Sequence, residues 1–241
     1  MKTLLVACII AFAHFVETST GFGATVIAVA LAAHFIPIKT LVVALVLIAW
    51  LQSAWIIARS FRHIRWDVFL GRILPLTALG LPFGIWCFRA LATDQLQTVL
   101  GLFVVAVAVL ELVRFRSNGR AVKPLAEWKG LAVLFGGGLF HGMFASGGPL
   151  VVYYAARKLD DKRSFRATLS LLWIVLNSAM IASYALSGRL DVESISLAAT
   201  LIPPFLIGVV AGEILHARIN ELAFRRFVYV VLLLTGVSFI V

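Results

Sequence analysis

Apolar residues run in ten stretches along the chain, separated by short breaks rich in Gly, Ser, Thr and charged residues. Five stretches fall in each half. A helix needs about 20 predominantly apolar residues to cross the hydrocarbon core of a bilayer. The last three stretches of each half meet that length and the first two do not, so the pattern predicts a short pair followed by three long helices, twice. The predicted stretches are 3–16, 21–37, 40–58, 68–90 and 95–113, then 130–141, 147–157, 167–187, 194–215 and 222–240.

The two halves also resemble each other residue by residue. "ILPLTALGLPFG" at 73–84 returns as "LIPPFLIGVVAG" at 201–212, offset by 128, and Gln52–Ala54 returns as Asn177–Ala179, offset by 125. Related halves with short segments at matching places are typical of secondary transporters, whose binding site lies at such segments. We therefore expect one membrane domain over 1–241, built from repeat 1 (1–116), a cytoplasmic linker (117–128) and repeat 2 (129–241).

Positive charge predicts the orientation of these helices. Of the 21 Lys and Arg residues, 17 fall in four regions, which we place in the cytoplasm because basic loops favour that side. All four regions can lie in the cytoplasm only if each short pair returns to the side of the membrane on which it started. Each half then crosses an odd number of times, so the halves are inverted and both termini are periplasmic. Whether each pair is a re-entrant hairpin or two short crossing helices stays open. The four regions are 59–72, 114–129, 157–166 and 218–226.

Composition agrees with an all-α polytopic membrane protein. Hydrophobic residues make up 62% of the chain and charged residues 13%, against about 25% charged in soluble domains. The net charge of +10 lies mostly in short loops, so we expect no nucleic-acid partner. Cys8 and Cys87 both lie in apolar stretches and predict no disulfide framework. No cofactor is expected.

The breaks within the two short pairs carry the residues expected of an anion site. The first break is 14–23 and the second is 141–149; inversion would bring them together. Each precedes a helix, and helix N-termini offer free N–H groups and a partial positive charge. Glycine lets a ligand approach the backbone, although tight helix packing is the alternative explanation. The predicted substrate-binding residues are Thr20, Gly21, Phe22, Gly23, Ser146, Gly147, Gly148, Gln52, Asn177, His14 and His141.

Three titratable residues are candidates for proton coupling. Glu17 is an acid between apolar stretches, where carboxylates are costly and usually functional; the alternative is a loop residue at the membrane surface. His14 and His141 occupy equivalent places and titrate near neutral pH, unless both are core histidines. Glu17 has no acidic counterpart in the second break, so coupling through it would be asymmetric. A metal site formed by the three residues is a further alternative, but no metal is predicted.

Two polar amides lie midway along long apolar helices. Gln52 and Asn177 would be unsatisfied if they faced lipid, so both are expected to point inward. They serve either as contacts between helices or as substrate ligands. Trp50 and Trp173 lie on the same helices and either line the cavity or pack in the core.

The segment 138–173, "GLFHGMFASGGPLVVYYAARKLDDKRSFRATLSLLW", resembles the second signature of the sulfite exporter TauE/SafE family, also called the 4-toluenesulfonate uptake permease family. "ETSTGFGATVIAVALAAHF" at 17–35 is similar to its first signature, but departs from the usual run of three glycines and adds Glu17. The resemblance implies a bacterial inner-membrane transporter of small anions such as sulfite, organosulfonates or related carboxylates. It also implies use of the proton-motive force and no ATP-binding module.

Together these observations predict a secondary transporter that works by alternating access, with a small anion, protons and the lipid bilayer as partners. Alternatives are an intramembrane enzyme that uses His14, His141 and Glu17, a channel-like anion pore, and a purely structural membrane subunit. The oligomeric state is open, with a homodimer as one alternative.

Overall fold

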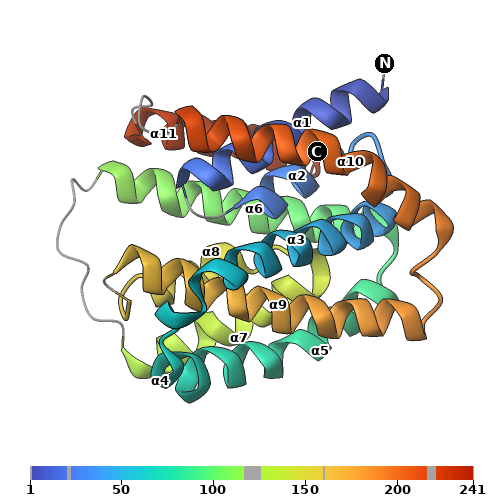
Figure 1. Ribbon diagram of the computed structural model, residues 1–241. Coiled ribbons are helices and arrows are strands. Elements are labelled where there is room, and N and C mark those ends of the chain that lie inside the picture. Colours follow the sequence, from blue (N-terminus) through green and yellow to red (C-terminus); the bar gives the residue numbers. More distant parts are fainter. Residues whose placement is uncertain (1, 21–22, 117–125, 160, 216–220, 241) are drawn as a thin grey trace. The chain divides into compact units, whose positions relative to one another are not determined.

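A computed structural model describes residues 2–20, 23–116, 126–159, 161–215 and 221–240, and every regular element in these ranges is helical (Figure 1). The ten predicted stretches appear in order, so the all-α prediction is confirmed. The first half contains α1 (Lys2–Thr20), α2 (Ala24–Ala32), α3 (Ile38–Ser60), η1 (Phe61–His63), α4 (Trp66–Val68), η2 (Phe69–Ile73), α5 (Leu74–Ala90) and α6 (Thr93–Arg116). The second contains α7 (Glu127–Phe144), α8 (Gly148–Ala155), α9 (Lys162–Leu186), α10 (Val192–Leu215) and α11 (Glu221–Ser238).

Five helical segments of the described chain are long and apolar enough to cross a membrane. They correspond to five of the six long helices that the sequence predicts. The sixth, predicted at 222–240, is a shorter apolar helix over the part searched, Arg226–Ser238. The five are Ile38–His63, Trp66–Ala90, Thr93–Val113, Arg163–Leu186 and Val192–Ile214.

The short pairs differ from their predicted lengths. The first member of each pair is longer than expected: α1 has 19 residues and α7 has 18, a rise of about 27–28 Å. The second member is shorter, with 9 residues in α2 and 8 in α8. The predicted boundary at His141 was wrong because Gly142 continues the helix and packs against α5. His14 likewise lies within α1, so the breaks begin later than the sequence suggested.

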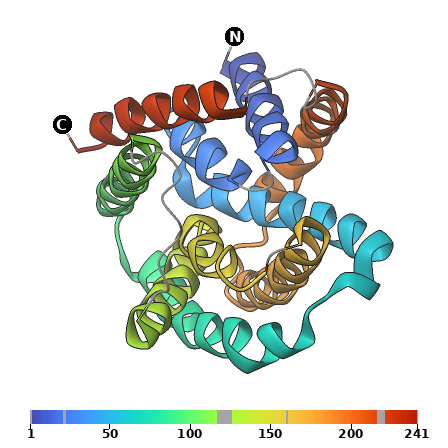
Figure 2. The same ribbon diagram turned by 90° about the vertical axis from the view of Figure 1, so that its left-hand side faces the viewer.

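The chain divides into two compact units. Unit 1 consists of Met1–Leu41, Leu91–Val122 and Ala199–Val241. Within it α1 packs against α2, and α6 packs against α11 (Figure 2). Gly101 of α6 and Gly236 of α11 face each other closely, because a Cβ on either would lie within about 3 Å of the other's carbonyl oxygen.

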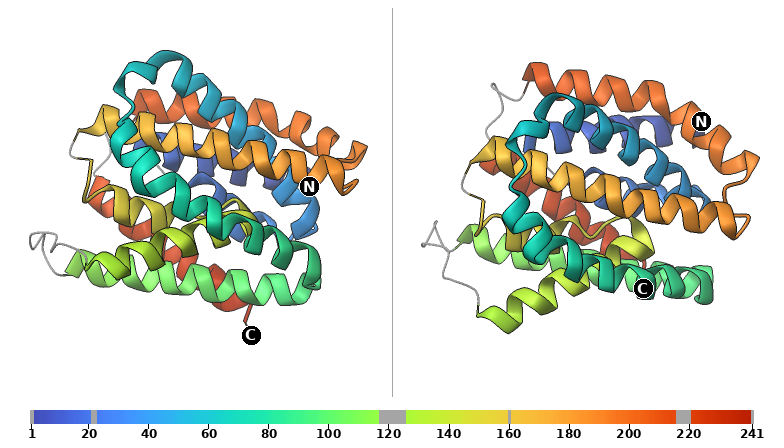
Figure 3. Two further views of the ribbon diagram at one scale, coloured as in Figure 1. Left: turned by 90° about the horizontal axis from the view of Figure 1, so that it is seen from below. Right: turned by 60° about the horizontal axis from the view of Figure 1, so that its bottom comes forward.

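Unit 2 consists of Val42–Ala90 and Lys123–Ala198. Here α5 packs along most of α7, and α7 also contacts α8 and α9 (Figure 3). α3 and α9 are joined by a hydrogen bond of 2.9 Å that Trp50 Nε1 donates to Ser178 Oγ. The buried residues of this unit include Leu45, Phe88 and Leu172.

The duplicated proline–glycine motif performs the same packing role in both units. In unit 2, a Cβ on Gly80 would lie 2.1 Å from the carbonyl oxygen of Phe135 in α7. In unit 1, a Cβ on Gly208 would lie 2.2 Å from the carbonyl oxygen of Ala11 in α1. The fourth of the five apolar segments of each repeat therefore packs against the first helix of the other repeat. The repeat boundaries and the inversion of the halves stay predictions.

Local sequence explains several helix ends. The backbone N–H of Ser164 donates to Asp161, the N-cap of α9, at 2.8 Å and holds the pKa of that carboxyl below its usual value. Asp191 accepts from the N–H of Ser194 before α10 in the same way, with its pKa also lowered. The π turn η2 precedes Pro75, whose missing N–H cannot bond the carbonyl of Gly71.

Candidate functional site

The break between α7 and α8 is a tight turn that exposes a helix N-terminus. Ala145 ends α7 in the left-handed region with φ of 52°, and its N–H donates to the carbonyl of His141 at 2.7 Å. α8 begins at Gly148, with Pro149 in its first turn as predicted. Ser146 is buried and its hydroxyl donates to the Phe144 carbonyl at 2.9 Å. That hydroxyl proton therefore stabilises the turn.

The glycines of this turn have two different explanations. A Cβ on Gly147 would lie 2.0 Å from the carbonyl oxygen of Gly137 and 2.9 Å from His141 Cβ, so Gly147 is required by packing. Gly148 has no atom within 4 Å of the same position, and its φ lies outside the left-handed region. Neither packing nor backbone conformation requires glycine there. Its missing side chain leaves open space beside the first N–H groups of α8.

His141 and Asn177 form a buried polar pair in the same unit. His141 Nε2 lies 3.0 Å from Asn177 Oδ1, and the ring of Trp173 stacks on the imidazole with centroids 5.0 Å apart. His141 is 3% exposed and Asn177 is fully buried. Trp173 and Asn177 are four residues apart and share a face of α9. Of the two roles proposed for Asn177, contact between helices is therefore observed.

This pair retains unused hydrogen-bonding capacity. Within the described ranges, neither His141 Nδ1 nor Asn177 Nδ2 has a hydrogen-bond partner. Buried polar atoms are nearly always paired, and the exceptions are commonly functional or hold a small molecule. Gln52 is half-buried on α3, two residues from Trp50, which bonds to α9.

The break between α1 and α2 belongs to unit 1 and is arranged differently. Thr20 ends α1 but its side chain lies outside the described part, as do Gly21 and Phe22. Gly23 caps α2 with φ of 103°, a conformation that favours glycine, and no atom lies within 4 Å of its Cβ position. The Ala24 N–H donates to Glu17 Oε2 at 3.1 Å.

A carboxylate of the protein thus already lies at the N-terminus of α2. The sequence placed Glu17 between the helices as a proton carrier; the structure places it in the last turn of α1, half-buried. The bond to Ala24 shows that this helix end attracts a negative charge. The second break, 141–149, has no acidic residue to occupy the equivalent end of α8.

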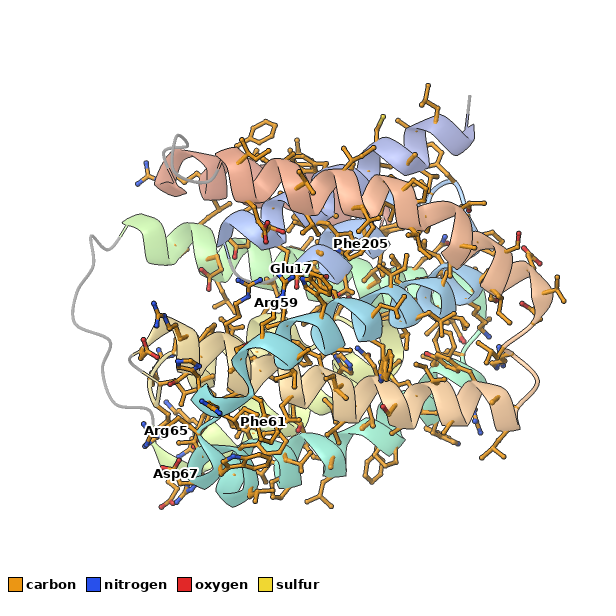
Figure 4. All side chains as sticks on the ribbon, viewed as in Figure 1. Glu17, Arg59, Phe61, Arg65, Asp67 and Phe205 are labelled. Atoms are coloured by element: carbon orange, nitrogen blue, oxygen red, sulfur yellow. The ribbon has the colours of Figure 1, made fainter. Side chains whose placement is uncertain are left out.

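His14 does not repeat the environment of His141. It is 1% exposed, and its ring contacts that of Phe205 in α10 edge-on, with centroids 4.7 Å apart. Phe205 is labelled in Figure 4. Its carbonyl accepts from the Thr18 hydroxyl at 2.8 Å. The two histidines lie in different units. No three His, Cys, Asp or Glu side chains of the described chain gather as metal ligands.

Comparison with known proteins decides the family. The family model described as "Sulfite exporter TauE/SafE" matches residues 6–239 of the 241-residue chain. The chain belongs to the sulfite exporter TauE/SafE family. The matched region contains both breaks, so the resemblance inferred from their sequences is confirmed. This TauE/SafE protein is a multi-pass membrane transport protein and not an enzyme.

Two curated relatives have informative names. The "Probable inner membrane transporter protein TsaS" of Comamonas testosteroni is 31% identical over 180 residues, 74% of each chain. The "Probable sulfite/organosulfonate exporter TauE" of Cupriavidus necator is 25% identical over 233 residues, covering 92% of this chain and 87% of the relative. No solved structure matches this TauE/SafE protein significantly.

Proposed function

We propose that this TauE/SafE protein is a secondary transporter of the bacterial inner membrane that carries sulfite, organosulfonates or related small carboxylates by alternating access, coupled to protons. The relative from Cupriavidus necator is named as a probable exporter of sulfite and organosulfonates. The observation that carries the proposal is the space at Gly148, where no protein atom lies within 4 Å of the Cβ position. There the N-terminus of α8 follows α7, whose His141 forms the buried pair with Asn177 of α9.

The chemistry of this turn suits an oxyanion. The first N–H groups of a helix are free donors, and the helix dipole adds a partial positive charge. The Asn177 amide has N–H groups without a partner among the described residues. A sulfite or sulfonate oxygen could accept from such donors without a buried cation.

Protons enter this proposal at two residues. When His141 Nε2 donates to Asn177 Oδ1, the neutral ring leaves Nδ1 as an acceptor, and only protonation turns Nδ1 into a donor for an anion. Binding of an anion nearby would therefore favour uptake of a proton. Glu17 would act differently, because protonation would weaken its hold on the Ala24 N–H and release the α2 N-terminus.

Flux measurements in proteoliposomes test the proposal. With an imposed pH gradient, we expect the reconstituted protein to accumulate sulfite or methanesulfonate above equilibrium. Gly148→Ala should lower transport about tenfold, because its methyl group would fill the open space beside the first N–H groups of α8. Loss of one hydrogen bond to a charged group costs about 1.5–3 kcal/mol. Gly71→Ala is the matched control, since Gly71 also has no atom within 4 Å of its Cβ position but lies in η2.

The outcomes separate the alternatives. Flux that only equilibrates the anion and carries current without proton movement would identify a channel-like pore. If Gly148→Ala and Gly71→Ala both transport at the wild-type rate, the turn at Gly148 does not bind the substrate.

A further inference from the structure

The helices of unit 2 carry their charged residues at their ends and not along their middle. Lys129 precedes His141 by about 18 Å of helix, and Arg166 precedes Asn177 by about 16 Å. Arg157 follows α8, whose eight residues rise about 12 Å from Gly148. The stretches of unit 2 without Asp, Glu, Lys or Arg are 42–58, 73–88, 130–156 and 167–188.

The backbone donors at the start of α8 are neutral and few. Pro149 has no N–H, and the Val151 N–H already donates to the Gly147 carbonyl at 3.2 Å. Of the first three residues of α8, only Gly148 and Leu150 therefore offer an N–H group to a ligand. The open space at Gly148 lies beside these two groups.

The side-chain donors next to this turn are also neutral. A Cβ on Gly147 would lie 2.9 Å from His141 Cβ, so His141 adjoins the turn. His141 Nε2 lies 3.0 Å from Asn177 Oδ1, and both side chains are more than nine-tenths buried. His141 Nδ1 and Asn177 Nδ2 have no hydrogen-bond partner among the described residues. Protonation of His141 would add one positive charge, and Asn177 adds none.

This set of donors suits one negative charge better than two. The free energy needed to remove an ion from water grows with the square of its charge, so it is about fourfold larger for a dianion of the same size. A helix N-terminus supplies only about half a positive charge. A dianion would need paired cations or many more donors, and unit 2 has neither along the middle of its helices.

The first repeat shows which charge a matching helix end accepts. In unit 1, the Ala24 N–H at the start of α2 donates to Glu17 Oε2 at 3.1 Å. A glutamate side chain carries a single negative charge when it is ionised. The occupant of the α2 N-terminus is therefore a tethered monoanion.

We propose that the turn at Gly148 selects monoanions. It binds organosulfonates and hydrogen sulfite, HSO₃⁻, and it excludes the sulfite dianion and sulfate. This inference rests on the proposed function and names the charge of the substrate at the same site. It implies that sulfite is bound together with one proton of its own.

Binding of matched anions to the purified full-length protein in neutral detergent tests the charge selection. Methanesulfonate and sulfate are both tetrahedral and similar in size, but sulfate carries one more negative charge. In calorimetry at one pH, methanesulfonate should bind about tenfold or more tightly than sulfate, because neutral donors do not offset the larger desolvation cost. Sulfate that binds as tightly as methanesulfonate would overturn the proposal.

Sulfite supplies a second test, because HSO₃⁻ and SO₃²⁻ interconvert near neutral pH. If only HSO₃⁻ binds, the apparent dissociation constant of total sulfite should rise by up to about tenfold per pH unit on the alkaline side. Methanesulfonate keeps its charge, so protonation of His141 or Glu17 should alter the affinities for both anions alike. A ratio of the two affinities that does not change with pH would contradict the proposal.

Two amide-to-acid variants test the neutral donors. Asn177→Asp keeps the oxygen that bonds to His141 but replaces the N–H donors with a second oxygen and adds a negative charge. Methanesulfonate should then bind about tenfold or more weakly. Gln95→Glu is the matched control: Gln95 is exposed on α6, and its Oε1 accepts from the Ala92 N–H at 2.9 Å. It should leave the affinity unchanged, and equal losses in both variants would overturn the proposal.

Flux in proteoliposomes separates charge selection from transport. Selective binding of methanesulfonate without flux would contradict the proposed transport and support the charge selection. Equal flux of methanesulfonate and sulfate would support transport and overturn the charge selection. Binding of none of these anions would also overturn it.

Discussion

At the scale of single residues, the two breaks differ in what lies at the N-terminus of the helix that follows each of them. The α2 N-terminus is occupied by the Glu17 carboxylate, which accepts from the Ala24 N–H at 3.1 Å. The α8 N-terminus has open space at Gly148 and no acid in its break. A helix N-terminus favours a negative charge in both cases. We therefore expect the substrate anion to bind at α8 and Glu17 to serve the other repeat as a tethered anion.

Glu17 provides a test that separates titration from capping. Glu17→Gln keeps an oxygen that accepts from Ala24 but removes the ionisable group, so the protein should fold normally and lose the pH dependence of its transport. Glu17→Ala removes the acceptor as well and should destabilise the start of α2 by about 1 kcal/mol. Transport rates between about pH 5 and 8 and thermal unfolding in detergent measure the two effects. A wild-type pH profile in Glu17→Gln would exclude Glu17 as the proton carrier.

Sequence alone indicated the polar residues at the breaks but not their partners. The duplication pointed to Asn177 and His141 separately, whereas their hydrogen bond depends on how α7 packs against α9. Gly147 and Gly148 are adjacent and identical in sequence, yet only Gly147 is enclosed by neighbouring atoms. Such differences depend on tertiary contacts, which a pattern of residue types along one chain does not contain.

At the scale of helices, close approach of backbones holds each unit together. Apolar surface contributes little to helix association in a bilayer, so small residues that permit tight contact become important. α5 lies against α7 through Gly84, whose Cβ position is 2.0 Å from the Leu139 carbonyl oxygen and 2.9 Å from Gly142 Cα. The sequence predicted the order of these helices because each is a continuous apolar stretch. It missed the length of α7 because glycine inside a membrane helix resembles a break.

Gly84→Ala should separate α5 from α7 and destabilise unit 2. The added methyl group would meet backbone atoms that cannot rotate away, and overpacking of this kind costs about 1–3 kcal/mol. Gly208→Ala should do the same in unit 1, where the nearest atom is the Ala11 carbonyl oxygen at 2.2 Å. Thermal unfolding in detergent should show a lower melting temperature for both variants and an unchanged melting temperature for the Gly71→Ala control. Unchanged melting temperatures would mean that these contacts do not limit stability.

At the scale of the whole molecule, the two units do not correspond to the two repeats. Each unit takes helices from both halves of the chain, and the chain passes between units within α3 and within α10. Alternating access by movement of the units would therefore require these two helices to bend. α10 contains Pro203 and Pro204 close to that passage, where missing N–H groups weaken the helix. That each unit contains helices of both halves could not be predicted from sequence, since the repeat shows which segments are alike but not which pack together.

Topology is the remaining whole-molecule prediction, and charge makes it testable. Three of the four basic regions contribute residues to one cavity of unit 2, among them Arg72, Glu127 and Arg157, so these regions share one end of that unit. Arg89, outside all four regions, lies at the other end of α5 and donates to the Ser183 carbonyl at 2.8 Å. If the four basic regions are cytoplasmic, the sequence predicts a periplasmic C-terminus. Alkaline phosphatase fused after the C-terminus should then be active, and a fluorescent protein fused there should be dark. The same reporters inserted at 117–128 should give the opposite result. Matching signals at both positions would show that the C-terminus and the linker lie on the same side and that the second half crosses an even number of times.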